Sequence, residues 1–201
     1  MMMKNKAEDI LNDLIKNKTD FDTSKKELIE VIKKVMPTFN LAALKAVDFD
    51  RTLIEFENWL VQTITEDPLP GSVKSIWFAI TDSSKEDAPS EIQLVVKGSK
   101  QTPETKPNDW YAVDLWDANG KSSEIKAFKT ISNAIKNNPD DAEMLLNFVM
   151  PAFTIILINS GFDIIKHEFI IYYPQIYVGC GFDGGKQYIV GKITEDGISN
   201  L

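Results

Sequence analysis

Hydrophobic side chains in the first third of the chain recur every three or four positions, which is the spacing of one face of a helix. The first such stripe lies within residues 7–18. A second stripe follows Ser24 and Glu27, whose spacing matches a capping box at a helix start, and Pro37 ends it. The pattern therefore predicts two amphipathic helices at the start of the chain.

A third helical region is predicted over residues 41–65, where Asp48 or Asp50 can cap the second half. Five apolar residues at helical spacing are expected to form its buried face. These are Phe49, Leu53, Phe56, Leu60 and Ile64. The prolines and glycine of residues 67–71 mark a boundary. Residues 1–66 are therefore predicted to form an N-terminal helical region.

Alternation of apolar and polar positions replaces the helical pattern after this boundary. It predicts strands at residues 73–81, 91–97 and 109–116. A last pair of strands is predicted within residues 176–193, because the Asp-Gly-Gly sequence at 183–185 tolerates the positive φ angles of a tight hairpin turn. We expect this hairpin to lie at the centre of a sheet.

Two further helices are predicted between the third strand and the hairpin. Residues 125–135 carry apolar side chains at helical spacing, and a longer apolar segment runs from Asp140 or Asp141 to Gly161. Apolar residues surround this longer helix, which predicts that it is buried on all sides. Residues 164–173 are expected to add a further strand, with continuation of the helix as the alternative.

These elements predict an α+β fold, in which a mainly antiparallel sheet of five to six strands packs against helices. A length of 201 residues suits a single domain spanning residues 1–201. Within it, residues 1–66 form the N-terminal helical region and residues 73–201 form the sheet with two helices. With 43% hydrophobic residues, the chain can bury a large core.

Charge narrows the classes of partner. The formal net charge is −8, and Arg51 is the only arginine. Nucleic acids and anionic membranes are therefore unfavourable partners, whereas acidic surfaces steer basic proteins. The longest apolar run, residues 148–158, is shorter than a membrane span. Because the first residues do not read as a signal peptide and the single cysteine permits no internal disulfide, we expect a cytoplasmic protein.

Residues 179–184 match the spelling Gly-x-Gly-x-x-Gly of the dinucleotide-binding motif. That motif requires a helix directly after the glycines, but residues 186–194 have the pattern of a strand. Gly179 and Gly181 are therefore expected to permit close packing or a bulge inside a strand. No cofactor is expected.

Cys180 and His167 are the single cysteine and the single histidine, so they form the one available pair of thiol nucleophile and imidazole base. A cysteine-dependent hydrolase that uses this pair is an alternative function. A lone cysteine in an apolar strand is more often a small core residue. No metal site is expected, because one histidine and one cysteine do not make a usual zinc site.

Acidic residues beside tryptophan are candidates for receiving lysine or arginine from a basic partner. The acids that flank the tryptophans around the third predicted strand are of this kind, and two further acids lie in the acidic third helical region. The predicted partner-binding residues are Asp109, Trp110, Asp114, Asp117, Glu55 and Glu57. The alternative is that the tryptophan fills a core and the acids solvate an edge strand.

Three sets of residues, taken in order, resemble small acidic bacterial proteins found beside secreted toxins. They are Leu69-Pro70-x-x-Val73-x-x-Ile76-x-Phe78, Asp109-Trp110 and Gly179-x-Gly181-Phe182-x-x-Gly185. This resemblance to immunity proteins implies a non-enzymatic protein that binds and blocks a cognate toxin. We therefore expect an acidic surface that occludes a basic toxin, on a monomer or weak homodimer. A structural or scaffold protein that pairs its edge strands is a further alternative.

Overall fold

The structure is a computed structural model, and its described residues are 2–16, 21–37, 39–82, 92–111, 114–118, 121–138, 142–173, 175–199 and 201. The helices are α1 (Met2–Lys16), α2 (Phe21–Val35), α3 (Ala42–Ala46), α4 (Phe49–Glu66), α5 (Lys126–Lys136) and α6 (Ala142–Tyr172). The strands are β1 (Ser75–Asp82), β2 (Ile92–Ser99), β3 (Asp114–Trp116), β4 (Tyr177–Phe182), β5 (Gln187–Thr194) and β6 (Gly197–Ser199).

The six strands form one mixed, mostly antiparallel sheet in the order β3-β2-β1-β4-β5-β6, which confirms the predicted α+β fold. Neighbouring strands run antiparallel except for the central pair β1 and β4, which run parallel with Ser75 beside Tyr177. The predicted C-terminal hairpin forms β4 and β5, with Gly184 at a φ of 75° in its turn. Its first strand lies at the centre of the sheet, as expected.

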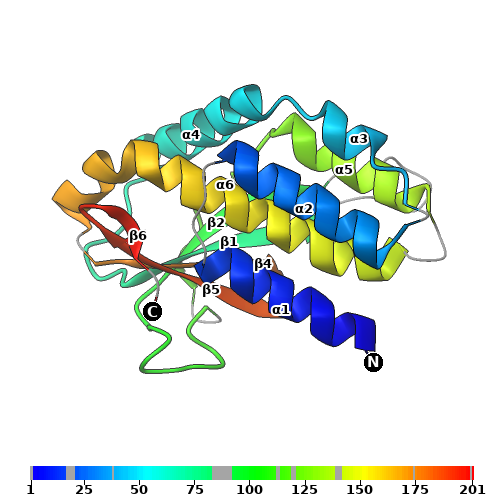
Figure 1. The fold of residues 1–201 in the computed structure, drawn as a ribbon. Coiled ribbons are helices and arrows are strands. Elements are labelled where there is room, and N and C mark those ends of the chain that lie inside the picture. Colours follow the sequence, from blue (N-terminus) through cyan, green and yellow to red (C-terminus); the bar gives the residue numbers. More distant parts are fainter. Residues whose placement is uncertain are drawn as a thin grey trace.

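Helix α6 is the centre of the helical layer. It packs against β1, β4, β5 and β6 on one side and against α1, α2, α4 and α5 on others, so it is buried nearly all round, as the sequence predicts. Figure 1 shows α6 between the sheet and the outer helices. Thr154 lies one turn after Pro151 and donates its hydroxyl hydrogen bond back to the Met150 carbonyl, 2.8 Å away, which satisfies a buried polar group.

Among the described residues, α6 is the one helix with the length and apolar composition of a membrane span, over Ala142–Ile165 with a mean hydropathy of 1.8. The helix extends well beyond the apolar run of residues 148–158 on which the sequence estimate of length was based. However, 78% of its most apolar window is buried inside the fold. Packing against the sheet and the outer helices therefore accounts for its composition.

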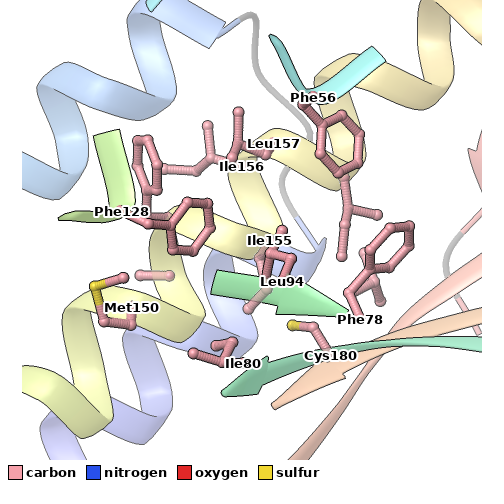
Figure 2. Packing of buried hydrophobic residues seen from close by; sticks show 14 of the residues in the cluster. Phe56, Phe78, Ile80, Leu94, Phe128, Met150, Ile155, Ile156, Leu157 and Cys180 are labelled. Atoms are coloured by element: carbon pink, nitrogen blue, oxygen red, sulfur yellow. The ribbon is translucent and has the colours of Figure 1, made fainter. Parts of the chain in front are cut away.

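The alternation of side chains along the strands gives the sheet two different faces. On the helical face, Ile76, Phe78 and Ile80 of β1 belong to the main hydrophobic core. Figure 2 shows Phe78, Ile80 and Cys180 packed close to α6 residues such as Ile155. The intervening residues of β1, Trp77 and Ala79, face the opposite side, where they form a second small core with Trp110.

The loop of residues 100–111 covers this opposite face, and Figure 1 shows it in green below the sheet. The Ser75 hydroxyl donates to the Gln101 carbonyl at 2.7 Å, and the Gln101 amide donates to the Ser99 hydroxyl at 3.0 Å. The Tyr177 hydroxyl donates to the Glu104 carboxylate. These hydrogen bonds hold the loop against β1, β2 and β4.

Three local predictions were wrong. Ser24 lies buried inside α2, which begins at Phe21, and so it does not cap the helix start. Residues 109–111 form turns, and within the described part of the predicted third strand the pairing with β2 is confined to Asp114–Trp116. Gly161 does not end the long helix, because its Cα lies against Phe56 of α4 inside a continuous α6 that runs on through residues 164–172.

Candidate interaction surface

The Glu55 side chain links helix α4 to helix α5. Its carboxylate accepts a hydrogen bond from the Lys126 amide at 3.1 Å, and Lys126 is the first residue of α5. The same carboxylate pairs with the Arg51 guanidinium at 3.0 Å. Because the amides of a first helical turn lack partners within the helix, Glu55 completes the N-terminus of α5 from a neighbouring helix. Its hydrogen-bonding capacity is thus largely used inside the fold.

Glu57 lies two residues further along α4 and has a different environment. Its Oε1 atom is shielded from solvent and accepts no hydrogen bond from the residues that the structure describes. Partial burial raises the pKa of the Glu57 carboxyl above its ordinary value of 4.5. A shielded carboxylate oxygen without a donor is unfavourable, and a cation supplied by a partner would relieve it.

Two exposed apolar side chains flank Glu57 at helical spacing. Ile54 is 56% exposed and Val61 is 40% exposed, and they lie one turn before and one turn after Glu57. We call the surface made by Ile54, Glu57 and Val61 the α4 face. Ile164, at 54% exposed, lies on α6 one turn beyond the point where Gly161 meets α4. The α4 face therefore combines apolar side chains with one unpaired carboxylate.

The sequence did not identify Ile54 and Val61 as candidates, although a signal was present. The five apolar residues assigned to the buried face of α4 are buried or half-buried in the structure. Ile54 and Val61 are the large aliphatic residues of this helix outside that stripe. Aliphatic residues that lie outside the buried face of an amphipathic helix indicate an exposed apolar surface.

The four candidates near β3 have different environments. Asp109 is exposed in the loop of residues 100–111, and Asp117 is exposed just after β3. Asp114 is the first residue of β3 and pairs with Ser99. Trp110 is 1% exposed and packs with Trp77, so this tryptophan fills a core, which was the alternative to a role in binding. Trp110 is therefore not part of an exposed surface with Glu55 and Glu57.

The glycines of the Gly-x-Gly-x-x-Gly sequence lie within a hairpin, as predicted. Gly179 and Gly181 are in β4, and the chain enters β5 after the turn. The indole ring of Trp110 occupies the space over Gly179, where a Cβ would lie 2.6 Å from the ring. Because no helix follows the glycines, this sequence lacks the amides that would bind a pyrophosphate.

The environments of Cys180 and His167 do not favour a catalytic pair. The Cys180 thiol is fully buried in the main core, where it pairs across the sheet with Phe78 and Tyr188. Burial raises the pKa of this thiol well above its ordinary value, which disfavours the thiolate that a nucleophile requires. His167 lies on α6 and is exposed. The hydrolase alternative therefore has no structural support from these two residues.

A second surface lies between the first two helices. A cavity of about 310 Å³ opens between α1 and α2. Its floor is apolar and its rim carries three carboxylates, from Asp13, Glu27 and Glu30, together with Lys34. We call this cavity the α1–α2 groove. Sequence patterning shows the apolar face of each helix, but the space between the two helices depends on how both pack on α6.

The described part of the chain contains no group of three or more histidine, cysteine or acidic side chains with the geometry of a metal site. Comparisons with protein-family models, with curated proteins and with solved structures found no match. The α4 face and the α1–α2 groove are the two candidate interaction surfaces of the described residues.

Proposed function

We propose that this protein binds and occludes a basic protein partner, as an immunity protein does with its cognate toxin. The α4 face is the docking surface in this proposal. Ile54 and Val61 supply apolar contact area, and Glu57 accepts a lysine or arginine from the partner. The net charge of −8 steers a basic partner toward the protein before this contact forms.

The observation that carries the proposal is the shielded, unpartnered Oε1 atom of Glu57 between two exposed apolar residues. Glu55, on the same helix, shows how a carboxylate is used structurally, because it pairs with Arg51 and the Lys126 amide. Glu57 has no comparable role in the fold among the described residues. Burial of Glu57 against a cation would convert this unfavourable environment into a specific contact.

The decisive test is co-expression with the product of the neighbouring gene. We expect that product to arrest growth when expressed alone, and to co-purify with this protein without arresting growth when both are present. A neighbouring product that is neither toxic nor bound would contradict the proposed function.

The surface is tested with Glu57→Gln, which keeps the size of the side chain and removes its charge. We expect this variant to bind the partner at least about tenfold more weakly, the effect of losing one desolvated charge pair. Asp50→Asn is the matched control, because Asp50 is an exposed acid on the same helix. Equal affinity of the Glu57→Gln variant and the wild type would place the interface elsewhere while leaving the immunity function intact.

A further inference from the structure

The floor of the α1–α2 groove consists of two apolar rows at helical spacing. Ile10 and Leu14 lie one turn apart on α1, and Leu28 and Val31 lie one turn apart on α2. Leu14 and Leu28 are buried, whereas Ile10 and Val31 are half-buried. Two such rows are the receiving half of a helix-in-groove contact, in which residues at i, i+3, i+4 and i+7 of a partner helix insert between them.

The rim of the groove is acidic. Three carboxylates face one ammonium group, that of Lys34, around the apolar floor. Lys33 offsets part of this charge, because it pairs with Glu30 at 3.7 Å. Asp13 on α1 and Glu27 on α2 therefore supply most of the negative potential, one from each side of the groove. A partner segment with apolar side chains flanked by lysine or arginine would be complementary to this apolar floor and acidic rim.

We propose that the α1–α2 groove is a docking site for an amphipathic helix of another protein that carries lysine or arginine beside its apolar face. Both α1 and α2 pack on α6, and Figure 1 shows them lying one above the other along it. A third helix laid along the groove would complete the outer layer over α6. This inference does not depend on the proposed function, because the groove and the α4 face share no residue.

The test uses a synthetic helical peptide of about 18 residues, long enough to form a helix in water. Its leucines repeat at i, i+3, i+4 and i+7, and lysines flank them. Isothermal titration calorimetry with the wild-type protein is expected to show one-to-one binding. A peptide of the same composition in scrambled order is expected to bind at least about tenfold more weakly, because its leucines no longer share one face.

Charge-reversal variants locate the site. Asp13→Lys combined with Glu27→Lys is expected to weaken peptide binding at least about tenfold. The control combines Asp9→Lys with Asp22→Lys, which reverses two exposed acids on the same helices outside the groove. The control has the same net charge and is expected to bind within about threefold of the wild type. The melting temperature of each variant shows whether it remains folded.

Three results would overturn the inference. Equal binding of the helical and scrambled peptides would show attraction by charge alone. Equal losses in the two double variants would exclude the groove as the site. Self-association of the wild type that is lost in the Asp13→Lys and Glu27→Lys variant would identify a second copy of this chain as the occupant. Because these measurements require no toxin, their failure is separate from failure of the proposed function.

Discussion

Trp110 lies directly over Gly179, and a Cβ at position 179 would come within 2.6 Å of its indole ring. The carbonyl oxygen of Tyr188 closes the same space at 2.8 Å. Position 179 therefore requires glycine, because the loop of residues 100–111 places Trp110 on the sheet beside it. Both roles expected from sequence occur at Gly179, because it packs closely against Trp110 and the pairing register of β4 with β5 shifts between Val178 and Gly179.

This contact predicts that Gly179→Ala is destabilising. The added methyl group has to displace the buried Trp110 or distort β5, which is expected to lower the free energy of unfolding by about 1–3 kcal/mol. Gly71→Ala is the control, because a Cβ there meets no atom within 4 Å. Urea denaturation of both variants measures the difference. Equal stability of the two variants would contradict the close packing of Trp110 on β4.

The environment of Glu57 predicts a pH-dependent difference between Glu57→Gln and the wild type. Because burial raises the pKa of Glu57 in the folded state, the charged form destabilises the wild type at neutral pH. The penalty grows as pH rises from the ordinary value of 4.5 through the folded pKa, and it is absent below both values. We therefore expect the variant to be the more stable protein at pH 7 and to lose this advantage near pH 4.

Denaturation midpoints of the two proteins at pH 4 and pH 7 measure this difference. Asp50→Asn serves as the control, because Asp50 is exposed on the same helix. A stability gain that is the same at both pH values would show that the charge of Glu57 is not its cause.

Replacement of Glu55 is predicted to destabilise the protein, whereas Glu57→Gln is predicted to stabilise it at pH 7. Glu55→Ala removes the acceptor for the Lys126 amide and the pairing with Arg51. Loss of a capping interaction is expected to lower the free energy of unfolding by about 0.5–2 kcal/mol. Arg51→Ala removes the exposed ion pair alone, with an expected cost of about 0.3–0.5 kcal/mol. If both variants lose the same stability, the contact with α5 contributes nothing.

The burial of Cys180 predicts that its thiol is inert in the folded protein. A thiol-reactive dye is expected to label it slowly in native buffer and rapidly in denaturant, because the thiol is fully buried. Rapid labelling of the native protein would restore the cysteine-hydrolase alternative. Cys180→Ser is expected to cost about 1–3 kcal/mol of stability, since it places a hydroxyl group in an apolar core.

The loop of residues 100–111 is predicted to loosen when Tyr177 is changed to phenylalanine. This change removes the hydroxyl that donates to Glu104 and leaves the ring on the sheet. We expect faster limited proteolysis within the loop. We also expect stronger quenching of tryptophan fluorescence by acrylamide, because Trp110 becomes accessible. An unchanged cleavage rate would show that the hydrogen bonds of Ser75 and Ser99 hold the loop unaided.

The elements that sequence predicted best have strong local causes. Asp-Gly-Gly forced the turn at 183–185, and Asp48 caps α4 through a hydrogen bond from the Arg51 amide at 3.1 Å. The apolar composition of α6 predicted its burial because no exposed face was left. Each of these outcomes depends on residues close together in sequence.

The features that sequence missed depend on distant partners. Trp110 follows the pattern of a strand, but packing on Gly179 places it in a loop. Residues 164–172 continue as helix within α6, which packs against β1, β4, β5 and β6. Glu55 and Glu57 look equivalent in sequence, and only the position of α5 gives one of them a partner. Parallel pairing of β1 with β4 is likewise set by the tertiary fold.

That parallel pairing has a consequence for biosynthesis. Strand β1 takes β4 as its neighbour, although β2, β3, α5 and α6 separate the two strands in the chain. As the polypeptide leaves the ribosome, the hairpin of β1 and β2 emerges with the free edge of β1 unpaired until β4 is translated. Such an intermediate is a natural client for a holdase chaperone. Pausing of translation before residue 177 would lengthen its exposure and lower the soluble yield.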